Sequence, residues 1–274
     1  MSRPLCVVLL ALLLAAQAAA QEPRAAPGRP GWMAVEGSGC LVWNANPQPG
    51  ETATWSGPCP GGRAAGEGVL VWRFRAEGEE RSARYEGEMR DGRAHGRGLY
   101  VTEDGDRYEG EWLDNDMHGR GVWIGANGDR YEGEWAAGEH HGFGTYTWAG
   151  GEFYTGFWRH GLREGMGVER DAEGALYKGG FREDARDGHG ILVFPDGGFH
   201  VGAWRGGVRH GYGEQVFADG ARYAGDYEDD MPHGQGRYIP ADGGEPFAGT
   251  WKEGCFRDGR GRVAAIGRPI EDCR

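Results

Sequence analysis

Five histidines recur at equivalent positions, each just before a Gly-x-Gly pair: His95, His118, His141, His210 and His233. A histidine column suggests zinc, which imidazole nitrogens hold at about 2.0–2.1 Å. Equivalent residues of neighbouring β-hairpins lie roughly 10 Å apart, because each hairpin adds two strands spaced about 4.8 Å. These histidines therefore cannot share one ion. We interpret them as turn or rim residues and predict no metal site.

Other polar patterns in the chain also fail to indicate catalysis. One Asp-Gly turn supplies few of the roughly 6–8 oxygens that calcium takes. The Gly-x-Gly pairs lack the third glycine of a dinucleotide-binding motif, and no Gly-x-Ser-x-Gly motif occurs. Glutamate pairs such as Glu109 and Glu111 have the pattern of a solvated strand face, and a glycosidase-type pair among them is the alternative. We predict a protein that is not an enzyme and uses no cofactor, and an exported enzyme is the least favoured hypothesis.

The aromatic residues indicate the elements that position these groups. In the segment from Tyr108 to Trp112, Tyr, Gly and Trp alternate with Glu, which is the period of a β-strand. The tyrosine position recurs every 23 residues, at Tyr85, Tyr108, Tyr131, Tyr154, Tyr177, His200 and Tyr223. Glycines two residues later share the aromatic face, so we expect the rings to lie over positions without side chains.

Each unit continues with a turn glycine, a second strand that begins at the Gly-x-Gly pair, and an Asp-Gly or Asn-Gly turn. Glu169-Arg170-Asp171 in the fourth unit and Asp184 in the fifth depart from the pattern. The predicted order is a signal peptide (1–20), a flexible leader (21–36), a degenerate N-terminal repeat or cap (37–84), seven repeats (85–246), and a degenerate repeat with a C-terminal cap (247–274). A charged loop is expected over 73–84.

This pattern of Tyr-x-Gly-x-Trp, turn glycine, Gly-x-Gly and Asp-Gly closely resembles the MORN repeat. The resemblance implies an all-β single domain, an elongated single-layered antiparallel meander of about eight consecutive hairpins. It also implies a role in protein–protein scaffolding or membrane tethering.

The cysteines add a constraint within such a sheet. Eight hairpins at roughly 10 Å each separate the two ends by several tens of ångströms, whereas a disulfide requires Cα atoms within about 7 Å. We therefore predict that Cys40 pairs with Cys59 and that Cys255 pairs with Cys273.

The N-terminus has the pattern of an export signal. Arg3 precedes an apolar run of 12 residues, Leu5–Ala16, and Ala18-Ala19-Ala20 fits a cleavage site before Gln21. Cys6 lies at the start of the apolar run rather than after it, which does not fit a lipoprotein anchor, and neither this run nor any other stretch is long enough for a transmembrane helix. The prediction is a secreted or periplasmic protein, a compartment in which disulfides persist.

The net charge of −12 excludes some partners. Nucleic acid is not expected, because its phosphates require Lys and Arg contacts, and binding to anionic lipid is disfavoured for the same reason. The favoured function is an exported scaffold that binds a protein or peptide through its aromatic concave face. A membrane-surface phospholipid tether is the alternative, and exposed edge strands leave a homodimer open.

Two interpretations of the aromatic face remain open. In the first, the rings simply fill the face. In the second, some rings stay partly exposed and line a groove, since exposed aromatic patches commonly mark binding sites. The candidate partner-binding residues come from the most regular units: Tyr108, Trp112, Tyr131, Trp135, Tyr154 and Trp158.

Overall fold

The computed structural model describes residues 30–76 and 78–273 and divides them into two compact units, one up to Ala149 and one from Gly150. The predicted signal peptide and the first part of the leader lie outside the described residues. In the described part of the chain, no helix has the length and apolar character needed to cross a bilayer.

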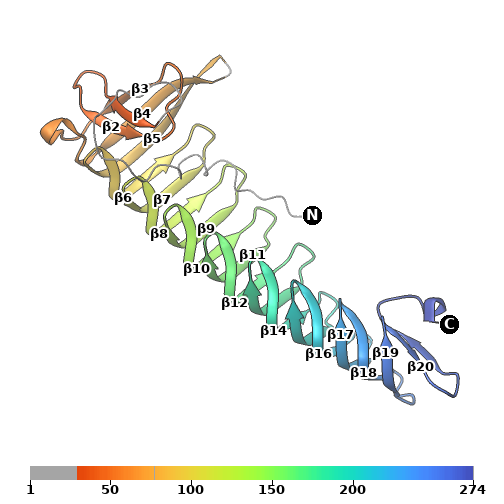
Figure 1. The fold of residues 1–274 in the computed structure, drawn as a ribbon. Coiled ribbons are helices and arrows are strands. Elements are labelled where there is room, and N and C mark those ends of the chain that lie inside the picture. Colours follow the sequence, from red (N-terminus) through yellow and green to blue (C-terminus); the bar gives the residue numbers. More distant parts are fainter. Residues whose placement is uncertain (1–29, 77, 274) are drawn as a thin grey trace. The chain divides into compact units, whose positions relative to one another are not determined.

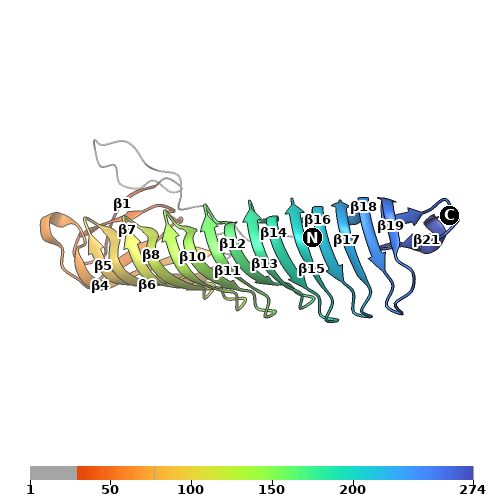
Figure 2. The same cartoon turned by 90° about the horizontal axis from the view of Figure 1, so that it is seen from below.

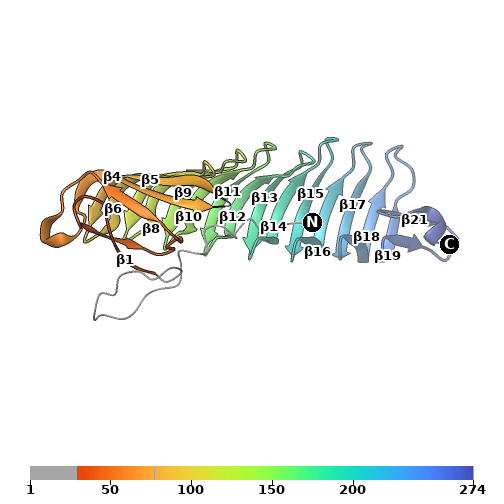
Figure 3. The same ribbon diagram turned by 90° about the horizontal axis from the view of Figure 1, so that it is seen from above.

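Unit 1 contains ten strands (Figure 1). They are β1 (Gly31–Ala34), β2 (Leu41–Asn44), β3 (Thr52–Trp55), β4 (Gly66–Ala76), β5 (Glu79–Arg90), β6 (Arg93–Val101), β7 (Arg107–Leu113), β8 (Asp116–Ile124), β9 (Arg130–Ala136) and β10 (Glu139–Thr147), with a short 3₁₀ turn, η2 (Pro60–Gly62). β1 and β2 form a separate hairpin, whereas β3 to β10 pair antiparallel in chain order (Figure 3).

Unit 2 repeats the same arrangement (Figure 2). Its strands are β11 (Phe153–Arg159), β12 (Leu162–Arg170), β13 (Leu176–Arg182), β14 (Ala185–Val193), β15 (Phe199–Arg205), β16 (Val208–Val216), β17 (Arg222–Glu228), β18 (Met231–Ile239), β19 (Phe247–Lys252), β20 (Cys255–Arg257) and β21 (Val263–Ala265), followed by η3 (Ile270–Cys273). Each strand pairs antiparallel with the next. The predicted all-β antiparallel meander is confirmed in each unit. That the two units together form a single domain stays a prediction.

The tight turn inside each hairpin has two residues with positive φ, the conformation that suits the twist of paired strands. Asp114 and Asn115 have φ of 53° and 82° in unit 1, and Glu183 and Asp184 have 47° and 70° in unit 2. Asp184 therefore replaces glycine without breaking the hairpin. Its carboxylate also accepts a hydrogen bond from the Arg163 backbone N–H at 2.8 Å, which ties adjacent hairpins together.

The Gly-x-Gly pairs mark a β-bulge that the alternation rule did not predict. In the β7–β8 hairpin the register shifts after Gly110, and Gly119, the first glycine of its pair, has φ of 57°. The equivalent glycines of the other hairpins also have positive φ, between 54° and 88°. The first glycine is thus required by the backbone of the bulge, since left-handed φ favours glycine.

Two expectations for the N-terminal region are wrong. The leader does not extend to residue 36, because residues 31–34 form β1 and Val35 is buried. Residues 73–84 are not a loop, since β4 and β5 continue through most of this segment as a long hairpin, with cross-strand partners from Gly66–Met89 to Ala76–Glu79.

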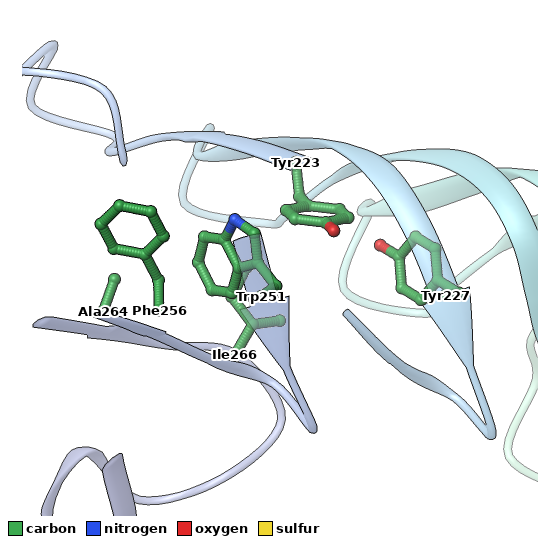
Figure 4. Close-up of a cluster of buried hydrophobic side chains, with 6 residues drawn as sticks. All are labelled: Tyr223, Tyr227, Trp251, Phe256, Ala264 and Ile266. Atoms are coloured by element: carbon green, nitrogen blue, oxygen red, sulfur yellow. The ribbon is translucent and has the colours of Figure 1, made fainter. Parts of the chain in front are cut away.

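The end of unit 2 carries its own small core. Trp251, Phe256 and Ile266 pack with Tyr223, Tyr227 and Ala264, and all six side chains are buried (Figure 4). The short strands β20 and β21 therefore close the aromatic face at this end, as a capping segment must in a repeat stack.

Both predicted disulfides are present. Cys40 pairs with Cys59 and Cys255 with Cys273, with Cα atoms 5.9 and 5.3 Å apart. The first joins the β1–β2 segment to the loop before β4, and the second attaches η3 to β20.

Replacing Cys40 and Cys59 with serine is expected to destabilise the N-terminal end of unit 1 by about 3 kcal/mol, the loop-closure value for a loop of this size. Hydrogen exchange in residues 31–64 should rise while exchange in β14–β16 stays unchanged. Equal protection of residues 31–64 in the variant and the parent would contradict this expectation.

Candidate functional site

The tyrosine column packs as the steric argument predicts. The Tyr108 ring lies over Gly121, where an added Cβ would be 2.3 Å from the tyrosine oxygen. The Tyr108 hydroxyl donates a hydrogen bond to the Glu111 carbonyl at 2.9 Å, and burial raises the pKa of this phenol. The same contact recurs from Tyr131 to the Glu134 carbonyl. Each ring is thus anchored as a protonated donor inside the sheet.

The six predicted partner-binding side chains do not form an exposed groove. The expectation of partial exposure is wrong for Tyr108, Trp112, Tyr131, Trp135, Tyr154 and Trp158, which are between 0% and 8% exposed. Edge-to-face contacts explain their burial: the Tyr108 and Trp112 rings are 5.1 Å apart, and those of Tyr108 and Trp135 are 5.3 Å apart. A direct role of these six residues in partner binding stays a prediction.

The histidine column does not converge on a site. The residues that the structure describes contain no group of three or more His, Cys, Asp or Glu side chains arranged to hold a metal ion. His140, next to the column residue His141, stacks on the Tyr131 ring with centroids 3.8 Å apart, and burial lowers its pKa to about 4.

A pocket of about 360 Å³ lies on the aromatic side of unit 1. One wall comes from the sheet: Leu70, Trp72 and Phe74 of β4, Tyr85 and Met89 of β5, Tyr100 of β6, Tyr108 and Trp112 of β7, and Met117 and Trp123 of β8. The second wall comes from β2 and the loop after it, through Trp43, Asn44, Gln48 and Glu51. Trp43, Trp72, Phe74, Tyr100 and Trp123 are only partly buried, unlike the tyrosine column beneath them.

The N-terminal segment is fixed against the sheet by backbone hydrogen bonds. The Trp43 N–H donates to the Gly92 carbonyl at 2.8 Å, and the Gly92 N–H donates to the Ala64 carbonyl at 2.8 Å. The Arg93 guanidinium lies over the Trp43 ring, 4.9 Å from its centroid. Because Gly92 belongs to the turn between β5 and β6, this wall is anchored directly to the sheet.

Carboxylates border the pocket. The Glu51 Oε2 atom accepts hydrogen bonds from Asn44 Nδ2 at 2.7 Å and from the Gln48 N–H at 2.9 Å, and burial raises its pKa. Burial raises the pKa of Asp116, as does the neighbouring Asp114 carboxylate. Burial also raises the pKa of Tyr100 to about 12, with smaller contributions from Glu103 and Glu51. The pocket thus combines aromatic walls with negative charge.

The comparisons with known proteins identify the repeat. The MORN repeat model matches seven consecutive segments: residues 85–107, 108–130, 131–153, 154–175, 177–199, 200–222 and 223–245. The chain belongs to the MORN repeat family. No curated protein matches it.

Among solved structures, the chain is similar to the SAS-4 (dCPAP) TCP domain of Drosophila melanogaster, in complex with a proline-rich motif of Ana2 (dSTIL). The identity is 15% over 57% of this chain and 84% of that chain, with a TM-score of 0.35.

The aromatic face of the MORN repeats differs in the fourth to sixth repeats. The position two residues after the second glycine of each pair holds Tyr100, Trp123 and Tyr146 in the first three repeats, Glu169, Leu192 and Gln215 in the next three, and Tyr238 in the seventh. Glu169 is stabilised by two arginines, with Arg163 Nη1 at 2.5 Å and Arg186 Nη2 at 2.8 Å. The irregular fourth repeat therefore keeps its strand and replaces an aromatic contact with ion pairs.

Sequence reasoning identified Tyr108 and Trp112 in the pocket floor but missed the residues that make it a pocket. Trp72 and Phe74 lie on the strand that we expected to end in a loop, and Glu51 belongs to the degenerate N-terminal segment, where the repeat pattern is incomplete. Tyr100 and Trp123 of the second strands could have been placed on the aromatic face from the sequence, because they alternate with residues of the opposite face.

Proposed function

We propose that this chain is an exported, non-catalytic MORN scaffold that holds a protein or peptide partner in the aromatic pocket of unit 1. The pocket geometry carries the proposal: partly exposed rings of Trp72, Tyr100 and Trp123 face a cavity of about 360 Å³, while the tyrosines beneath them are sealed. Partly exposed aromatic side chains of this kind are typical anchors for binding partners.

The two disulfides support export, because such bonds persist in secreted and periplasmic proteins and are rare in the cytosol of most organisms. The carboxylates of Glu51, Glu103 and Asp116 at the pocket favour a protein or peptide over an anionic phospholipid surface. A homodimer through an edge strand stays a prediction.

The test is selection of random peptides displayed on phage against the folded protein. Peptides selected on the parent should lose binding to Trp123→Ala and retain it with Ile124→Ala. Ile124 is the matched control because it follows Trp123 on β8, is 38% exposed and does not line the pocket. Circular dichroism should first show that both variants fold.

Peptide binding that is equal in the parent and Trp123→Ala would contradict the proposed site. If the protein sediments with phosphatidylserine vesicles and no peptide is selected, the membrane-surface tether is favoured instead.

A further inference from the structure

Unit 2 shows which kind of side chain packs on the aromatic face of a MORN repeat. In unit 2, three arginine side chains lie over the rings of this face. The Arg163 Cζ atom is 5.6 Å from the Tyr154 ring centroid, and Arg186 Cζ is 4.9 Å from that of Tyr177. Arg209 repeats the contact over Tyr227 at 5.2 Å. A guanidinium is attracted to the face of an aromatic ring at such distances.

These arginines are also paired with carboxylates. Arg163 Nε lies 3.2 Å from Asp184 Oδ1, and Arg209 Nε lies 3.0 Å from Asp230 Oδ1. All three guanidinium groups are largely shielded from solvent, with side chains 17–20% exposed. The arrangement in unit 2 is therefore a cation held between an aromatic face and an acidic partner.

Unit 1 lacks these cations at the same repeat positions. The period of 23 residues places Ala94, Met117 and His140 where unit 2 has Arg163, Arg186 and Arg209. The strand register agrees, since Trp112 is opposite Met117 as Trp158 is opposite Arg163. Ala94 and Met117 both line the pocket.

The period places Asn115 and Gly138 where unit 2 has Asp184 and Asp230, so the carboxylates of the pocket come from other positions. Glu51, Glu103, Asp106 and Asp116 line the pocket, and none forms an ion pair with a basic side chain within residues 30–76 and 78–273. The one basic residue of the lining, Arg107, pairs with Glu109. The Arg93 guanidinium lies over one wall ring, Trp43, at 4.9 Å, while the pocket also offers the partly exposed rings of Trp72, Tyr100 and Trp123 together with carboxylates.

We propose that the unit 1 pocket binds an arginine side chain presented by a basic peptide segment of the partner. This inference rests on the proposed function and specifies its ligand. The guanidinium stacks on the partly exposed rings of Trp72, Tyr100 or Trp123, and its N–H groups donate to the Glu51 carboxylate. A planar guanidinium suits this arrangement better than a lysine ammonium, because it stacks on rings and is less strongly hydrated.

Calorimetric titration of the folded protein tests the proposal with the peptide acetyl-Gly-Arg-Gly-Arg-Gly-amide. Its citrulline counterpart keeps the planar side chain and removes the charge. The arginine peptide should bind at least about tenfold more tightly than the citrulline peptide. Its affinity should fall as salt is added, since exposed charge pairs are screened.

Two matched variants locate the charge effect. Glu51→Gln keeps an oxygen that accepts from Asn44 and Gln48 and loses the charge, so it should weaken the arginine peptide about tenfold and leave the citrulline peptide unchanged. Glu132→Gln removes the same charge from an exposed residue outside this pocket and should bind as the parent does.

Several outcomes would overturn the inference. If the arginine and citrulline peptides bind equally well and both lose binding to Trp123→Ala, the preference for arginine is refuted. The proposed function then still stands. Arginine-peptide binding that survives Trp123→Ala would place the cation elsewhere. Equally tight binding of free arginine methyl ester would identify a small cation rather than a peptide. If neither peptide binds, the inference is refuted. The phage selection then tests separately whether the pocket binds any peptide.

Discussion

The Gly121→Ala variant is expected to lose about 2–3 kcal/mol of folding free energy, the cost of overpacking a well-packed interior. The new Cβ would lie 2.3 Å from the Tyr108 oxygen and 2.5 Å from its ring carbons. The ring cannot move aside easily, because it is 2% exposed and its hydroxyl is held by the Glu111 carbonyl. Urea unfolding followed by tryptophan fluorescence measures the loss.

The control for this substitution is Gly259→Ala. An added Cβ at Gly259 would have no heavy atom within 4 Å, and its backbone is outside the left-handed region. Its stability should stay within about 0.5 kcal/mol of the parent, as for most surface changes. Equal unfolding midpoints for the two variants would show that the tyrosine rings do not require the glycines beneath them.

The second large effect is acid destabilisation through His200. This residue occupies the tyrosine column of the sixth repeat, its ring is 0% exposed, and neither ring nitrogen has a hydrogen-bond partner among the described residues. Burial lowers its pKa to about 4, helped by the Arg209 charge and opposed by Asp230. The neutral imidazole is therefore the form that the fold accepts.

The direction of the pH effect follows from this shift. The unfolded chain takes up the proton near pH 6.5 and the folded chain only near 4, so stability is complete above about pH 6.5 and declines as pH falls. The full loss from this one group is roughly 3 kcal/mol at 1.36 kcal/mol per pKa unit.

His200→Tyr should remove this contribution. The glycines that accommodate the other rings are present at Gly202 and Gly213, and a tyrosine hydroxyl there would reach the Ala203 carbonyl as Tyr177 reaches Gly180. Thermal unfolding midpoints of unit 2 between pH 7 and about pH 4 should fall less in the variant than in the parent. Parallel declines in the two proteins would contradict the assignment.

The parts of the structure that the sequence predicted are those that the 23-residue period determines. Tyr108 over Gly121 follows from strand alternation together with the size of the ring, and the disulfide pairs follow from the distance between the ends of such a sheet. The bulge at Gly119 did not follow, because alternation alone does not show where one strand contains extra residues.

The pocket could not be predicted from the sequence, for a different reason. Trp43 and Glu51 lie in the degenerate N-terminal segment, and their position in the pocket wall depends on long-range contacts such as that between Trp43 and Gly92. Alternation also places Trp112 and Trp123 on one face without distinguishing the sealed ring from the partly exposed one. Nothing in the sequence indicated that the arginines of unit 2 lie over aromatic rings. The strand register shows it, because it places Arg163 opposite Trp158.

The central claim is that the aromatic pocket of unit 1 is the binding site. The most direct measurement is the tryptophan indole N–H spectrum of the ¹⁵N-labelled protein, assigned by single substitutions, before and after addition of the arginine peptide. We predict that the indole signals of Trp43, Trp72 and Trp123 shift while those of Trp204 and Trp251 stay in place. Shifts confined to Trp204 and Trp251, or shifts of the pocket indoles that persist unchanged with the citrulline peptide at the same concentrations, would contradict the binding of an arginine in this pocket.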